Sequence, residues 1–151
     1  MINGKEMKLY NILFPIWLIL LIPTAWLVVL PVNFIVDSVV LLIAMRAMNI
    51  LHRKNMYKKT ILKIWIFGFL SDIIGALAIF GAMALFELNI QGDEPILTIP
   101  ATLIAAIFIF IFNYKISFKG YDKKIGFKMA LTFAIATAPY TFLIPLSWIY
   151  Y

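Results

Sequence analysis

Two aspartates stand inside long apolar stretches, Asp37 in NFIVDSVVLL and Asp72 in FGFLSDIIGALAIF, and each has a serine beside it. The surrounding stretches are long enough to cross a bilayer. A carboxylate in hydrocarbon costs roughly 3 kcal/mol on insertion scales unless it meets protein, water or a counter-charge. The two carboxylates therefore indicate a membrane protein with a polar interior.

Asp37 has neighbours that suit a polar or ion-binding site. Asn33 lies one helical turn away, Ser38 is adjacent, and Tyr140 and Thr141 fall at a similar depth in the expected helices. Carboxylate, amide and hydroxyl oxygens favour a proton or a hard cation over a soft metal. The alternative is a carboxylate near a helix start, satisfied by backbone amides and interface water.

Asp72 has a candidate partner on the preceding helix. Counted from the expected outer helix ends, Arg46 and Asp72 both lie about 21–22 Å deep, which predicts a buried ion pair. In the alternative, Arg46 extends to the membrane surface and leaves Asp72 free to titrate or to bind a cation. The same counting separates Asp72 from Asp37 by about 15 Å along the membrane normal.

The sequence gives little support to catalytic or metal-binding chemistry. A separation of about 15 Å is too large for two aspartates that share a proton, and the GxGD arrangement of intramembrane aspartyl proteases is absent around Asp72. The single histidine, His52, lies in a basic cluster, and the chain has no cysteine. We therefore expect no catalytic residue, no metal site, no cofactor and no enzymatic activity.

The composition defines the class of protein that positions these residues. Of the 151 residues, 64% are hydrophobic and 13% are charged, whereas roughly a quarter of a soluble domain is charged. We expect an all-α membrane protein whose residues 1–151 form a single integral membrane domain in contact with lipid. The net charge of +6 then reflects orientation in the membrane, and we expect no nucleic-acid partner.

The spacing of charges and turn residues predicts a five-transmembrane-helix bundle. The stretch 9–51 is too long for one span. The turn expected at 30–33 divides it better than one at Pro23–Thr24, which would leave the first segment too short. An acidic loop at 87–95 and a basic loop at 115–128 separate the later spans. The expected helices are about 9–29, 33–51, 64–86, 96–113 and 129–149.

The thirteen basic residues predict the orientation of the bundle. No lysine or arginine occurs between Ile64 and Tyr114 or after Lys128. With five spans, the basic connections lie on one face, which the positive-inside rule makes cytoplasmic. We expect a cytoplasmic N-terminus, an outside C-terminus and a multi-pass protein of a plasma (inner) membrane, and the small size and sparse loops favour a bacterial one.

Small residues recur at helical spacing in the third expected span. They let another backbone approach closely, so plain helix packing explains them, although a narrow lined path is the alternative. A similar stripe in the fifth span contains Thr137 and Thr141. The stripe in the third span contains Gly68, Ser71, Gly75 and Ala78.

Two classes of function remain. The first is a small transporter or channel, acting as an oligomer, in which Asp37 and also Asp72 contact a proton, a cation or a small solute. The second is a non-catalytic accessory or regulatory subunit that binds another membrane protein through its small-residue faces. The first expects a water-accessible path to the aspartates, and the second expects both carboxylates to be satisfied within the protein.

Overall fold

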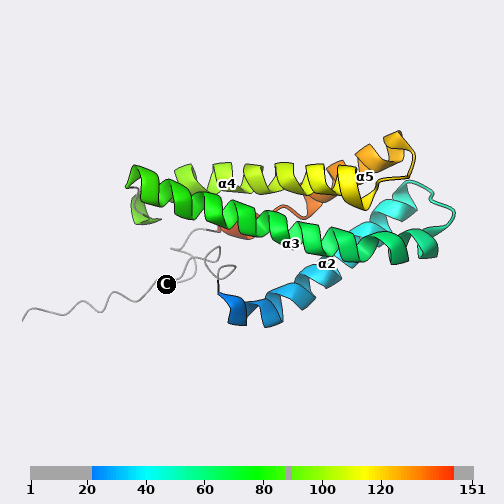
Figure 1. The fold of residues 1–151 in the computed structure, drawn as a ribbon, viewed down its shortest axis with the longest axis horizontal. Helices are drawn as coiled ribbons and strands as arrows, with labels where there is room; N and C mark the ends of the chain where they lie inside the picture. Colours follow the sequence, from blue (N-terminus) through cyan, green and yellow to red (C-terminus); the bar gives the residue numbers. More distant parts are fainter. Residues whose placement is uncertain (1–21, 88–89, 145–151) are drawn as a thin grey trace, which may run out of the picture.

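The computed structural model describes residues 22–87 and 90–144, and within them the chain is helical and contains no strand. Four long helices follow one another in antiparallel order (Figure 1). Three short turns complete the described part. The helices are α2 (Trp26–Ala47), α3 (Arg53–Phe86), α4 (Ile90–Phe112) and α5 (Lys123–Ala136), and the turns are η1 (Pro23–Ala25), η2 (Asn113–Ser117) and η3 (Tyr140–Leu143).

Within the described residues, three helices are long and apolar enough to cross a membrane, namely Pro23–Ala47, Arg53–Phe86 and Ile96–Ser117. Their outer surfaces carry exposed large apolar side chains, as at Leu27, where 82% of the residue is exposed. Lipid suits such a surface far better than water does. The all-helical class is therefore confirmed for the described residues, and three of their helices can span a membrane. The count of five spans is not confirmed, because that part of the chain holds four long helices.

The boundary expected between the first two spans is wrong. No turn occurs at 30–33, because α2 runs without interruption through Pro31. The neighbouring α3 supports this part of α2: the Trp65 indole donates a hydrogen bond of 2.8 Å to the Leu30 carbonyl. Proline is tolerated inside membrane helices, where neighbouring helices and water satisfy the backbone carbonyl that it leaves free. The expected helix 9–29 otherwise falls largely outside the described residues.

The helix expected at 129–149 is also interrupted. α5 begins earlier, at Lys123, and ends at Ala136, and residues 137–139 are not helical. Pro139 has no backbone N–H to donate, and it disfavours helical geometry in the residue before it. The chain then forms the 3-10 turn η3, and residues 145–151 lie outside the described part.

The basic residues gather at one end of the described bundle. The connections from α2 to α3 and from α4 to α5 lie at the same end, and the connection from α3 to α4 lies at the other (Figure 1). α3 has 34 residues, about 51 Å, against a hydrocarbon thickness of about 30 Å. Its first turns, which carry Lys54, Lys58 and Lys59, therefore extend beyond the apolar layer at what we call the basic end.

The α3–α4 contact depends on the small residues of α3. A Cβ atom added to Gly75 would lie 3.0 Å from the Ala105 Cβ, 3.0 Å from the Phe142 ring and 3.1 Å from the Ala101 carbonyl oxygen. Ser71 is fully buried and donates to the Phe67 carbonyl. Of the other two residues in this stripe, Ala78 is half-buried and Gly68 faces α2 instead. Gly75 thus marks the closest approach.

Candidate functional site

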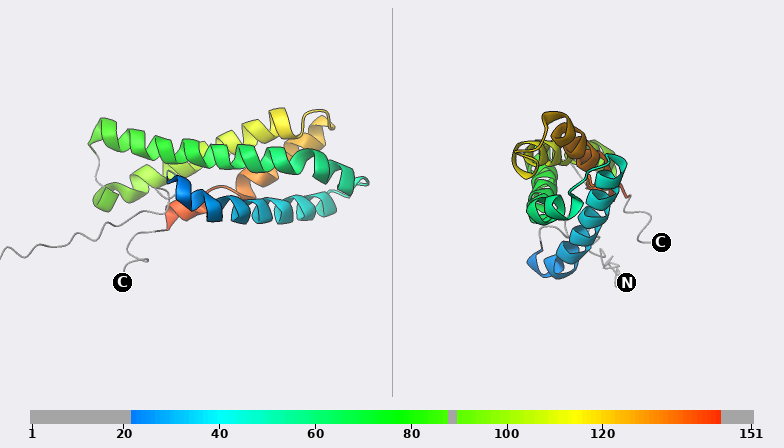
Figure 2. Two further views of the ribbon diagram at one scale, coloured as in Figure 1. Left: turned by 60° about the horizontal axis from the view of Figure 1, so that its bottom comes forward. Right: turned by 90° about the vertical axis from the view of Figure 1, so that its right-hand side faces the viewer.

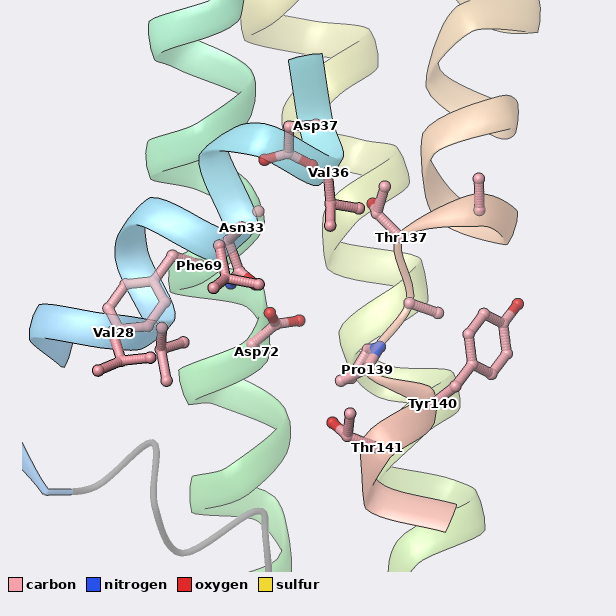
Figure 3. A pocket seen from close by; sticks show the side chains of 15 residues that line it. Val28, Asn33, Val36, Asp37, Phe69, Asp72, Thr137, Pro139, Tyr140 and Thr141 are labelled. Atoms are coloured by element: carbon pink, nitrogen blue, oxygen red, sulfur yellow. The ribbon is translucent and has the colours of Figure 1, made fainter. Parts of the chain in front are cut away.

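A cavity of about 480 Å³ opens between α2, α3 and the interrupted segment after α5. The left view of Figure 2 shows α2 beside the segment that follows α5, and Figure 3 shows the cavity from close by. Its polar lining comes from all three elements. The polar residues are Asn33, Asp37, Asp72, Thr137, Tyr140 and Thr141, and the main apolar ones are Val28, Val29, Val32, Val36, Phe69 and Pro139.

Asp37 enters the cavity from α2. It is 5% exposed, and its side chain lies against α3 at Gly68. A Cβ atom added to Gly68 would lie 3.6 Å from Oδ2 of Asp37, an ordinary van der Waals distance, so the carboxylate packs directly against α3 at this position.

Asp72 enters the same cavity from α3, one helical turn after Gly68. It is 9% exposed, and its Oδ1 atom is buried without a hydrogen-bond partner among the described residues. An unpartnered buried polar atom is costly, and the cost is larger for a charged group. Asp72 is therefore the group in this cavity whose surroundings most require a ligand, a proton or water.

The two aspartates share a cavity because α2 starts earlier than the sequence suggested. Asp37 lies against Gly68, which precedes Asp72 by one helical turn. The two aspartates are therefore about 6 Å apart along the axis of α3 instead of about 15 Å. The expected separation is corrected by the early start of α2.

Arg46 and Asp72 are not brought together. Arg46 lies in the last turn of α2, close to the basic end, and its side chain is exposed. It lies nine residues, or about 14 Å, beyond Asp37 towards the basic end, whereas Asp72 lies one turn beyond Gly68 in the opposite direction. The expected ion pair rested on a helix start at residue 33. With α2 starting at Trp26, Arg46 is exposed near the basic end, away from Asp72.

The interrupted segment 137–139 supplies the third wall of the cavity. The Thr137 hydroxyl donates a 2.8 Å hydrogen bond to the Phe133 carbonyl, and the Tyr140 hydroxyl donates one to the Ile135 carbonyl. These bonds satisfy carbonyls at the end of α5. Non-helical backbone at membrane depth is tolerated where it is buried in protein or lines a cavity that holds water. The break after α5 and the two carboxylates line the same cavity.

The residues expected to form a site around Asp37 are partly assembled. Asn33 lies on the same face of α2, and Thr141 lines the opposite wall. Tyr140 also borders the cavity, but its ring points away from the carboxylates in Figure 3. Ser38 does not line the cavity, because its hydroxyl forms a 2.9 Å hydrogen bond with the Tyr57 hydroxyl. That these residues bind an ion stays a prediction.

Sequence reasoning missed three lining residues as members of a site. Gly68 and Thr137 appeared only as parts of small-residue stripes, and Phe69 was not singled out. The signal for Thr137 was present, because Pro139 two residues later ends the helix there. The signal for Gly68 was its position one turn before Asp72. Nothing in the spacing alone indicated Phe69.

The shared cavity also removes one reason for excluding a carboxylate pair. The assumed separation of about 15 Å does not hold, whereas the absence of a GxGD arrangement around Asp72 does. The prediction that the chain is not an enzyme now depends on the missing motifs alone. Within the described residues, no group of three or more His, Cys, Asp or Glu side chains is placed to hold a metal ion.

Comparison with protein-family models, with curated proteins and with solved structures gives no match to this chain. The class of protein therefore follows from the fold and the cavity: the described residues are all helical or in short turns, three of their helices can span a membrane, and two aspartates line one cavity. Function has to be proposed from the chemistry of that cavity.

Proposed function

We propose that the chain is a small membrane transporter or channel that binds and conducts a proton or a small cation through the cavity of Asp37 and Asp72. The observation that carries this proposal is the shared cavity itself, which two carboxylates line and to which the described part of the chain contributes no basic residue. Two like charges in a medium of low dielectric repel strongly, and a cation between them offsets that repulsion.

The walls of the cavity narrow the class of cation. One side is built from valines of α2 and the ring of Phe69, and the other from Pro139 and two threonines. Oxygen ligands are available from Asp37, Asp72 and Asn33, which suits a proton or a hard cation. The apolar walls also suit the methylene groups of a small organic amine, so such amines belong among the probes.

The accessory-subunit alternative is supported less well. It expects both carboxylates to be satisfied inside the protein, yet Oδ1 of Asp72 lacks a partner among the described residues. It would be preferred if the purified protein conducted nothing. The five-span arrangement, the plasma-membrane location, the bacterial origin and the oligomeric state remain part of the proposal.

The proposal is tested by flux into liposomes. The purified full chain is reconstituted, and entry of protons, Na⁺, K⁺ and methylammonium is followed separately under an imposed gradient. Protein-free liposomes prepared in the same way give the background. We expect a rate above background for at least one of these cations. Rates at background for all four, with correctly folded protein in the liposomes, would favour the accessory-subunit alternative.

The orientation gives a separate prediction. Because the described basic residues gather at one end, we expect that end to be cytoplasmic. The chain has no cysteine, so single cysteines can be introduced cleanly at Lys54, Lys119 and Glu87. In intact cells a membrane-impermeant maleimide should label Glu87→Cys, and Lys54→Cys and Lys119→Cys should react only after the membrane is opened. A reporter that is active only outside should also give signal when fused after Tyr151.

Labelling of Lys54→Cys in intact cells would show that the basic end lies outside, opposite to the expected orientation. Labelling of Lys54→Cys and Glu87→Cys from the same side would contradict the membrane crossing of α3. A silent outside reporter at Tyr151, with the three cysteines labelled as expected, would reject an outside C-terminus and leave the crossings of α2 to α4 intact.

A further inference from the structure

A second cavity, of about 740 Å³, lies at the basic end and is separate from the aspartate cavity. It is bounded by the connection from α2 to α3, the first turns of α3 and the chain from Ser117 to Ile125. Its lining is cationic: Lys59 and Lys63 come from α3, and Lys119 comes from the chain that follows η2. His52, which precedes α3, lies at its edge.

The start of α3 faces this second cavity and is not capped by a side chain. His52 occupies the N-cap position and accepts no hydrogen bond from the helix with its side chain, and Asn55 and Met56 of the first turn line the cavity. The first amides of a helix have no partner within the helix and attract anions. The start of α5 differs, because the Asp122 carboxylate accepts from the amides of Lys124 and Ile125.

A buried polar side chain without a partner also borders the second cavity. Ser117 is 2% exposed, and its hydroxyl oxygen has no hydrogen-bond partner among the described residues. It closes the π-helical turn η2, in which the Phe118 amide bonds back to the Asn113 carbonyl. Such wide turns are frequent at functional sites. Ser117 lines the second cavity, and its hydroxyl donor is unused among the described residues.

The charge around the second cavity points to the same chemistry. Residues 48–63 and 113–128 contain ten lysines and arginines and one acidic residue, Asp122, whose carboxylate already caps α5. Lys59 and Lys63 lie four residues apart on one helix, where like charges are destabilising without a counter-ion. An anion in the cavity would offset this repulsion, and its oxygens would accept from the lysines, the free amides of α3 and the Ser117 hydroxyl.

We propose that the second cavity is a binding site for a phosphate group. Phosphate offers several acceptor oxygens and negative charge, which match three ammonium groups, a helix start and a hydroxyl donor. The phosphate can belong to an anionic lipid headgroup at the membrane surface or to a free phosphate ion, and the two sources are distinguished by experiment. The site does not depend on the proposed transport function.

The test measures the thermal unfolding of the full chain in a phosphate-free maltoside detergent. One arm adds inorganic phosphate, compared with NaCl at equal ionic strength. The other adds a phosphatidylglycerol to the micelles, compared with the same amount of phosphatidylcholine. We expect a rise of about 3 °C in the unfolding temperature in at least one arm. A rise with inorganic phosphate assigns a free ion, and a rise with the lipid alone assigns a headgroup.

Two matched triple variants test the location of the site. The cavity variant removes three charges from the second cavity by combining Lys59→Gln, Lys63→Gln and Lys119→Gln. The control removes three charges at the same end but outside the cavity. Each lysine should contribute on the order of fivefold to the affinity, so the cavity variant should bind about 100-fold more weakly. The control, Lys115→Gln with Lys123→Gln and Lys128→Gln, should retain the rise in unfolding temperature.

Ser117→Ala keeps every charge and removes only the buried hydroxyl. It should reduce the affinity for the phosphate group while leaving the unfolding temperature of the ligand-free protein nearly unchanged, and so serves if the cavity triple does not fold. Equal loss in both triples would mean that only net charge matters. That result, or no rise in either arm with the unaltered chain, would overturn the proposal.

Discussion

Replacing either cavity aspartate by asparagine should reduce cation flux to the level of protein-free liposomes. Asn has the shape of Asp but carries no charge and cannot release a proton, so the ligand loses the group that offsets its charge. Asp37 and Asp72 reach the cavity from different helices, so each single substitution should have this effect. The measurement is initial flux per reconstituted protein for the cation that the unaltered chain conducts.

The fold should survive these substitutions. The asparagine amide removes a charge from a low-dielectric site where Oδ1 of Asp72 has no partner among the described residues, so the unfolding temperature should stay equal or rise. The matched control is Asp122→Asn, an aspartate outside the cavity whose capping role asparagine retains. Unchanged flux in a well-folded Asp37→Asn and Asp72→Asn double variant would remove the main reason for proposing transport.

Substituting Gly75 should produce the largest loss of stability among the glycines of α3. A side chain there meets Ala105, Phe142 and the Ala101 carbonyl at 3.0–3.1 Å, and two of these neighbours cannot rotate away. Overpacking of this kind costs about 1–3 kcal/mol. Gly75→Val should therefore unfold at lower denaturant, measured by titrating the purified protein from a mild detergent into SDS.

Gly81 in the same helix provides the control, because a Cβ atom there would meet nothing within 4 Å. Gly81→Val should change the free energy of unfolding by no more than about 0.5 kcal/mol, as is usual for substitutions away from tight contacts. Since Phe142 belongs to η3, Gly75→Val should also disturb the wall of the aspartate cavity and lower flux. Equal losses at Gly75 and Gly81 would mean that α3 and α4 do not pack as closely as the structure has them.

The membrane class and the two unusual carboxylates could be predicted from the sequence, because both depend on local composition. The pairing of Asp37 with Asp72 could not, since it depends on where α2 begins. Pro31 resembles a turn signal, but in a membrane helix the contact from Trp65 supports the chain on the α3 side. An error of seven residues at one helix start moves a side chain by about 10 Å.

The sequence carried a clearer signal for the end of α5 than for the start of α2. Pro139 and the residue before it indicate a helix stop, yet the apolar run 129–149 favoured a continuous span. The second cavity was not predictable in the same way. In the sequence, Lys59 and Lys63 only belong to a basic stretch that indicates orientation. The folded chain brings them near Lys119 and Ser117, whose hydroxyl has no partner among the described residues. Long-range contacts of this kind leave no periodic signal.

Protection of the two cavity carboxyls by a bound cation is the most direct measurement of whether Asp37 and Asp72 form one site. A hydrophobic carbodiimide modifies carboxyl groups in apolar surroundings, and mass spectrometry of peptides locates each modified residue. If one cation occupies the cavity, increasing concentrations of the conducted cation should slow modification of Asp37 and Asp72 with the same midpoint. Exposed Glu87 serves as the internal control and should not respond. Protection of only one aspartate, or of neither by any conducted cation, would contradict a shared cation site.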